Sequence, residues 1–208
     1  MSSDWREILY TLIKWCIENA IEIIATITGI LYLMYSVRAS VLLWPFGLIT
    51  SFLYVYVFCS SKIYADMGIN IYYVLVSIYG WIHWYLGKEN NNEVPISYLS
   101  RKQWLFVLIS CFILYFIIVF ILKKYTDSDV PYLDSFTTAA SVVATWMLAR
   151  KIIEHWLFWV VIDALSIGLY MYKKLYPTVF LFIIYTVFAI AGYYEWKKMY
   201  NMNMIKSE

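Results

Sequence analysis

The chain has 208 residues, of which 63% are hydrophobic and only 14% are charged, and its formal net charge is +2. Ordinary soluble domains are about 45–50% apolar and about 25% charged, so a chain this short cannot bury such an apolar excess in one core. The composition excludes a soluble globular domain, and the small, dispersed charge indicates no nucleic-acid partner. We expect an all-α integral membrane protein whose surroundings include membrane lipids.

The N-terminal segment, residues 1–17, begins "MSSDWREILY" and places Trp5, Leu9 and Trp15 among charged residues. This pattern predicts a short amphipathic helix that lies on the membrane surface. No basic stretch precedes the apolar residues, so we expect no cleaved signal peptide.

Seven apolar segments follow, each close to the roughly 20 residues that a helix needs to cross about 30 Å of hydrocarbon. They lie at 19–37, 41–59, 67–86, 103–122, 133–149, 156–173 and 176–196. The apolar runs are long and do not alternate with polar residues, which indicates helices rather than a β-barrel. Lys and Arg are slightly more numerous on the side of the C-terminus, which favours a cytoplasmic C-terminus.

An internal repeat appears when the chain is shifted by 112 residues. The shift aligns Arg38 with Arg150, Trp44 with Trp156, Lys62 with Lys174, Tyr73 with Tyr185, Gly80 with Gly192, and Trp84 with Trp196. Identities of Arg, Lys, Gly and Trp at one fixed offset indicate duplication of a three-helix unit.

The repeat predicts the organisation of the whole chain. Residues 18–87 form the first repeat, 88–132 a linker with the fourth span, 133–197 the second repeat and 198–208 a polar tail. Three spans change the side of the membrane and the linker span restores it, so the two repeats run parallel in a 3+1+3 arrangement. Parallel repeats are typical of transporters that bind substrate between the halves, near the bilayer midplane.

Polar and aromatic residues form stripes on single faces of several predicted spans. One stripe carries Asn70, Tyr73, Ser77, Trp81 and Trp84; a second carries Trp156, Trp159 and Asp163; the fifth span contributes Thr145. Asp163 is costly inside a membrane span, and it aligns with Ser51 in the repeat, so the charge occurs in one half only. It either anchors a substrate or makes a hydrogen bond or ion pair between helices, for example with Arg38 or Arg150.

The aromatic residues also have simpler interpretations. Trp84 and other tryptophans near the ends of spans are compatible with interfacial anchors or core packing. His83 is more commonly a core or interface histidine than a ligand. Cys16, Cys59 and Cys111 are isolated, so we expect no disulfide framework, no metal site and no cofactor.

The seven spans, the motif "YGWIHW" and the long pattern from Trp146 to Trp196 together resemble the PnuC-type vitamin transporters. These are bacterial inner-membrane proteins best known for nicotinamide riboside uptake and similar in fold to the SWEET sugar transporters. The resemblance implies facilitated diffusion, trapping of the vitamin by cytoplasmic phosphorylation, and a homo-oligomer, possibly a trimer. It also implies a site built on Trp81, Trp84, Trp156 and Trp159.

The identity of the vitamin stays open at this point, because His83 and His155 stand where nicotinamide riboside transporters favour amide side chains. Related members of the family carry thiamine, and a membrane enzyme or an assembly subunit is a further alternative. Nicotinamide riboside and thiamine are both small, flat cations that tryptophan faces attract. Asp163 would add charge complementarity, and Asn70, Ser77, Thr145 and Tyr185 would supply further contacts.

Overall fold

The computed structural model describes residues 9–11, 14, 20–60, 64–87, 94–126, 129–172 and 174–207. Seven long helices lie within these ranges: α2 (Ala20–Val37), α3 (Leu43–Ser60), α4 (Tyr64–Leu86), α5 (Arg101–Tyr125), α6 (Pro131–Ala149), α7 (His155–Tyr172) and α8 (Tyr176–Ser207). Each overlaps one of the seven expected segments, and α8 continues through most of the segment expected to be a polar tail. The amphipathic helix expected over residues 1–17 falls largely outside the described residues, although 9–11 and 14 are helical and exposed.

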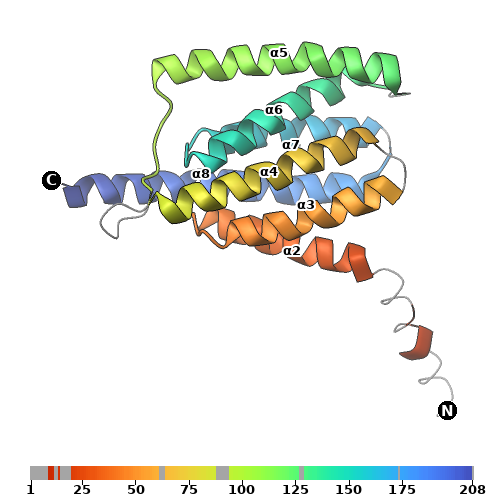
Figure 1. Ribbon diagram of the computed structural model, residues 1–208, viewed down its shortest axis with the longest axis horizontal. Coiled ribbons are helices and arrows are strands. Elements are labelled where there is room, and N and C mark those ends of the chain that lie inside the picture. The colour runs from red at the N-terminus through yellow and green to blue at the C-terminus, as the bar shows by residue number, and fades with distance from the viewer. Residues whose placement is uncertain are drawn as a thin grey trace.

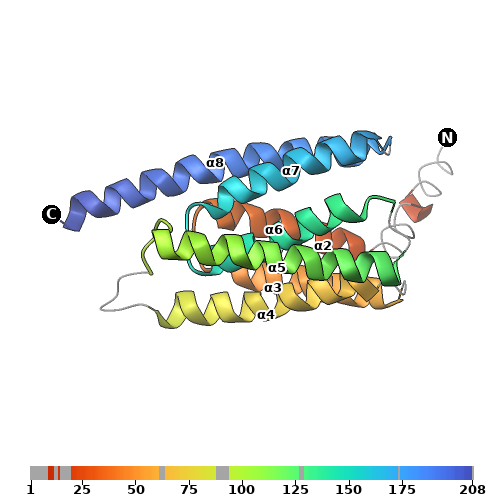
Figure 2. The same ribbon diagram turned by 90° about the horizontal axis from the view of Figure 1, so that it is seen from above.

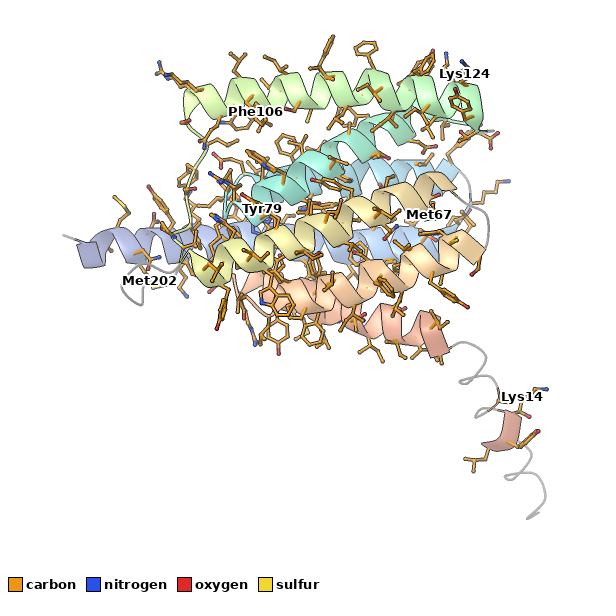
Figure 3. The ribbon with its side chains drawn as sticks, viewed as in Figure 1. Lys14, Met67, Tyr79, Phe106, Lys124 and Met202 are labelled. Carbon is orange, nitrogen blue, oxygen red and sulfur yellow. The ribbon has the colours of Figure 1, made fainter. Side chains whose placement is uncertain are left out.

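Six of the helices form a closed ring, and α5 lies outside it. Around the ring, α2 packs on α3, α3 on α4, α4 on α6, α6 on α7, α7 on α8, and α8 on α2. Figure 2 shows α7 and α8 on one side, α3 and α4 on the other, and α2 and α6 between them. The outer helix α5 packs on α6, where the rings of Phe106 and Trp146 lie 5.5 Å apart (Figure 3).

The segment between α4 and α5 is tied to the turn between α6 and α7. The Ser97 amide donates to the Lys151 carbonyl, and the Ile153 amide donates to the Ser97 carbonyl, at 2.9 and 3.0 Å. A Glu154 carboxylate oxygen accepts from the Leu99 amide at 3.0 Å. These bonds fix the path of the chain before it enters the outer helix.

The 112-residue offset recurs in the helix boundaries. The second and third helices of the two halves begin at residues 43 and 64, and at 155 and 176. The first helices of the halves, α2 and α6, end at 37 and 149. Figure 1 shows that α2 and α6 run in the same direction, as do α3 and α7, and α4 and α8. The two halves are therefore parallel copies of one three-helix unit.

The turn after the first helix is also the same in both halves. Ala39 and Lys151 have φ angles of 50° and 53°, in the left-handed region. Hydrogen bonds from the Ser40 amide to Tyr35 and from the Ile152 amide to Met147 close the two turns at 3.0 Å each. An identical strained turn at positions 112 residues apart supports duplication more strongly than apolar identities do.

Four tryptophans form a layer near the end of the ring where α4 ends and α7 begins. This tryptophan layer consists of Trp44, Trp84, Trp156 and Trp196, each at most 2% exposed. Rings of Trp44 and Trp84 meet edge to face at 5.3 Å, and those of Trp156 and Trp196 at 6.0 Å. The two contacts are related by the repeat and make the layer the centre of the main core.

Glycines on the third helices make room for this layer. A Cβ at Gly80 would overlap the indole of Trp44, and a Cβ at Gly192 would overlap the indole of Trp156. Each glycine thus allows the third helix of its half to approach the second helix closely.

Apolar length marks several of the helices as membrane spans. Within the described part of the chain, four segments are long and apolar enough to cross a bilayer, namely Leu43–Ser60, Arg101–Tyr125, His155–Tyr172 and Thr178–Ile205, and Ile23–Val37 is a shorter apolar helix. The helices α4 and α6 carry more polar residues, and on α6 Ser135, Ser141 and Thr145 are buried. Polar side chains at membrane depth are tolerated where protein covers them. The chain is an all-helical, multi-pass membrane protein.

We expect Gly80→Ala and Gly192→Ala to lower the thermal midpoint of the protein in detergent. The added methyl group meets a buried indole, and overpacking of this kind costs about 1–3 kcal/mol. Gly68→Ala and Gly168→Ala are matched controls, since both glycines are helical and have open space where a Cβ would lie. Equal thermal midpoints for the two pairs of variants would contradict this account of the layer.

Candidate functional site

A cavity of about 450 Å³ lies within the helix ring. Its volume is in the range of small-molecule sites. Helices α2, α4, α6, α7 and α8 supply its walls, through Gly29, Tyr32, Leu33, Ser36, Ile69, Tyr73, Thr137, Thr138, Ser141, Leu148, Trp156, Trp159, Ile162, Asp163, Ser166, Tyr170, Phe182, Tyr185 and Ala189.

Residues of both halves line the cavity. Both members of three repeat-related pairs line it: Gly29 with Ser141, Ser36 with Leu148, and Tyr73 with Tyr185. A ligand in this space therefore contacts both halves, as expected for a site between two repeats.

The walls of the cavity differ between the halves, and two repeat-related positions on α7 and α3 are the most informative. Trp159 of α7 aligns with Gly47 of α3, and Asp163 aligns with Ser51. In the first half, the Tyr32 ring packs so close to Gly47 that an added Cβ would lie 2.8 Å from it. In the second half, the tryptophan and the carboxyl group line the cavity. At these two positions the second half thus exposes an indole and a carboxyl group to the cavity, whereas the first half does not.

Asp163 is the only acidic or basic side chain among the residues that line the cavity. It is 4% exposed, and within the described part of the chain its carboxyl group makes no hydrogen bond and no ion pair. Arg150, one of its expected partners, instead donates to the Tyr79 hydroxyl at 3.2 Å. A buried carboxyl group without a partner is costly in a membrane protein and indicates a ligand site.

Two serine hydroxyl groups of the cavity wall donate to carbonyl groups of their own helices. Ser141 donates to the Thr137 carbonyl, and Ser166 donates to the Ile162 carbonyl, both at 2.8 Å. A hydroxyl that donates to its own helix keeps its oxygen lone pairs for another partner. The cavity therefore offers acceptors to a ligand that is rich in donors.

Aromatic side chains supply the apolar part of the walls. Trp159 is partly exposed in the cavity, and Trp156 forms its floor at the tryptophan layer. Tyr170 and Phe182 stack with ring centroids 5.2 Å apart. The faces of large aromatic rings are suited to a flat ligand, particularly a cationic one.

Four of the residues predicted from the sequence line this cavity: Trp156, Trp159, Asp163 and Tyr185. The other six do not line it: Asn70, Ser77, Trp81, His83, Trp84 and Thr145. The predicted faces of the second half therefore converge on the cavity, and much of the predicted face of α4 does not.

The two tryptophans of the "WIHW" motif lie in different surroundings. Trp81 is 40% exposed and does not line the cavity, and its neighbour His83 stacks in parallel on the Tyr79 ring at 5.8 Å. Trp84 lies in the tryptophan layer, where its indole N–H donates to the Ala149 carbonyl at 3.0 Å.

The smaller predicted residues bond within their own helices or pack between helices. Asn70 donates to the Asp66 carbonyl at 2.9 Å, and Thr145 donates to the Ser141 carbonyl at 2.8 Å. Ser77 is buried beside Gly47.

The first helix of the first half, α2, contributes more to the cavity than the sequence pattern predicted. Tyr32 and Ser36 of α2 line the cavity, but α2 carries no continuous polar stripe that would mark them. The repeat offers the missing signal, because Ser36 aligns with Leu148, one helical turn from the predicted Thr145, and both Ser36 and Leu148 line the cavity.

The described residues contain no group of three or more His, Cys, Asp or Glu side chains able to hold a metal ion. His155 lies in the tryptophan layer, against Trp156 and Trp196, and its Nδ1 lies 2.6 Å from the Ile152 carbonyl oxygen. The histidine is thus part of the packed core at the floor of the cavity.

Comparison with known proteins links this architecture to a transporter family. Residues 19–198 match the family described as "Nicotinamide mononucleotide transporter". A nicotinamide riboside transporter PnuC of Neisseria mucosa is 28% identical over 188 residues, which cover 85% of this chain and 71% of the relative. The PnuC of Escherichia coli is 27% identical over 201 residues, covering 85% and 84% of the two chains.

A more distant relative and a solved structure complete the comparison. The riboflavin/roseoflavin transporter RibM of Streptomyces davaonensis is 20% identical over 178 residues, covering 84% of this chain and 83% of the relative. The crystal structure of a vitamin B3 transporter PnuC superimposes with a TM-score of 0.71 at 26% identity, covering 94% of this chain and 88% of the other. The chain belongs to the nicotinamide mononucleotide transporter family and is a PnuC-type vitamin transporter, not an enzyme.

Proposed function

We propose that this protein takes up nicotinamide riboside across a bacterial inner membrane by facilitated diffusion. Cytoplasmic phosphorylation of the imported riboside then traps it and maintains the inward gradient. The observation that carries the proposal is the composition of the cavity wall, which combines Trp159, the buried Asp163 and many hydroxyl groups, without any Lys or Arg. The named nicotinamide riboside transporters among the relatives support the same substrate.

Nicotinamide riboside matches this wall in charge and in shape. Its pyridinium ring is flat and permanently positive, so it is attracted to an indole face by about 0.5–2 kcal/mol. Its carboxamide and ribose hydroxyl groups are hydrogen-bond donors for the Asp163 carboxyl group and for the oxygens of Ser141 and Ser166. The positive ring and the donor groups of the substrate therefore have complementary groups in the cavity.

The same wall disfavours the phosphorylated product. A phosphate group is bound most strongly by cationic donors, and the cavity lining contains neither Lys nor Arg. Bringing a phosphate near Asp163 would also cost electrostatic free energy. The nucleotide formed in the cytoplasm would consequently not return through the site.

We propose that the seven helices cross the membrane as two parallel three-helix repeats joined by α5. This topology agrees with the direction of the helices in Figure 1 and places the cavity between the halves. The proposal includes a homo-oligomer such as a trimer, as the resemblance to PnuC-type transporters implies.

Thiamine is the second candidate substrate, because its thiazolium ring is also flat and permanently cationic. Transport into proteoliposomes separates the candidates. Vesicles that contain the protein, a riboside kinase and ATP should accumulate labelled nicotinamide riboside, and vesicles without the kinase should only equilibrate it. Accumulation of thiamine with thiamine kinase, without uptake of nicotinamide riboside, would contradict the proposal.

We expect Trp159→Ala to raise the apparent KM for nicotinamide riboside uptake roughly 3- to 30-fold, since it removes a cation–π partner worth about 0.5–2 kcal/mol. Trp81→Ala is the matched control, because Trp81 lies outside the cavity. Initial rates of uptake over a range of substrate concentrations give both KM values. An unchanged KM for Trp159→Ala, or an equal increase for Trp81→Ala, would show that the cavity is not the binding site.

A further inference from the structure

The cavity is closed at the tryptophan layer. Trp156 belongs both to the layer and to the cavity wall, and the neighbouring wall residues Ser36, Leu148 and Ala189 are at most 2% exposed. Wall residues toward the other end, including Ile69 and Tyr170, are partly exposed. The cavity is therefore closed at one end, and the tryptophan layer separates it from the surroundings there.

Two hydrogen bonds in the layer join one half of the protein to the other. Trp84, on the third helix of the first half, donates from its indole N–H to the carbonyl of Ala149 at the end of α6, at 3.0 Å. Trp196, on the third helix of the second half, donates to the carbonyl of Ser36 near the end of α2, at 2.9 Å. The two bonds are related by the repeat, and both use carbonyl groups from the last turn of a helix.

The other two tryptophans of the layer do not make such bonds. Within the described residues, the indole N–H groups of Trp44 and Trp156 have no hydrogen-bond partner. Their rings pack on Gly80 and Gly192, each within its own half. The layer thus divides into two tryptophans that pack each half internally and two that connect the halves.

We propose that Trp84 and Trp196 hold the gate at this end of the pathway closed through their indole hydrogen bonds, and we call them the latches. Passage of a substrate requires the layer to part, which separates the third helix of each half from the first helix of the other and breaks both bonds. The inference rests on the chain being a transporter and not on which vitamin it carries. Hydrogen bonds suit a reversible gate, because the separated N–H and carbonyl groups can bond to water once the gate is open.

The second half also supplies side chains that contact the rings of both latches, Trp84 and Trp196. The Lys151 ammonium group lies 4.4 Å from the centre of the Trp84 ring, and His155 meets the Trp196 ring at 4.7 Å. Their repeat-related residues are Ala39 and Leu43, which are apolar. The closed gate is therefore held by one symmetric pair of bonds and by an asymmetric set of aromatic contacts.

Cysteine accessibility tests the latch in the full-length protein without any substrate. In a variant with Cys16, Cys59 and Cys111 replaced by Ser, Ser36→Cys places a thiol at the closed end of the cavity. A membrane-impermeant thiol reagent is added from the side on which the tryptophan layer lies, and the rate of labelling is measured. We expect Trp84→Phe to raise this rate about fivefold, since one hydrogen bond to the closed state is lost.

Replacement of Trp84 by β-(3-benzothienyl)alanine keeps the bicyclic shape, removes only the N–H donor, and should have the same effect. The equivalent replacements of Trp196 should raise the labelling rate of Leu148→Cys by a similar factor, because the two hydrogen bonds are related by the repeat. Trp104→Phe is the control, since Trp104 lies on the outer helix α5 and outside the layer.

Two results would overturn the inference. One is an unchanged labelling rate in both the phenylalanine and the benzothienylalanine variants. The other is an equal increase at Ser135→Cys, a buried position at the opposite end of α6, because that would indicate general loosening instead of gate opening. Neither result depends on uptake of nicotinamide riboside, so failure of the latch and failure of the proposed substrate can be told apart.

Discussion

The crossed hydrogen bonds of Trp84 and Trp196 set the position of one half of the protein relative to the other. Each bond starts on the last helix of one half and ends on the first helix of the other, so together they close the ring of six helices. The cavity exists because this ring is closed, and its floor is the layer in which the bonds lie. Gly80 and Gly192 are required by the same arrangement, since any side chain there would displace a neighbouring indole.

The two halves share one frame, and they differ in the residues that line the cavity. The strained turns, the tryptophan layer and the helix boundaries are alike in both halves. Trp159 and Asp163 stand where the first half has Gly47 and Ser51, so the indole and the carboxyl group that the proposed substrate would contact both lie on α7. The proposed mechanism uses both features, because symmetric halves can separate at either end while one asymmetric site holds the substrate.

The sequence predicted the helices and the repeat well, because the length of apolar runs and a fixed offset are set by local residue patterns. It predicted the site less completely. On α7, Trp156, Trp159 and Asp163 share one helical face, and that face does line the cavity. On α4, Trp84 shares a face with Tyr73, yet its indole reaches across to α6 and packs in the core. Periodicity identifies a face of a helix, but which neighbour covers each turn of that face depends on how the helices cross.

The central claim is that the cavity binds an unphosphorylated, cationic riboside. Calorimetric titration of the purified protein with nicotinamide riboside and with nicotinamide mononucleotide, under the same conditions, tests it most directly. The two ligands share the pyridinium ring and the ribose and differ in one phosphate group. The account predicts saturable binding of the riboside and at least tenfold weaker binding of the mononucleotide. Equal or tighter binding of the mononucleotide would contradict it.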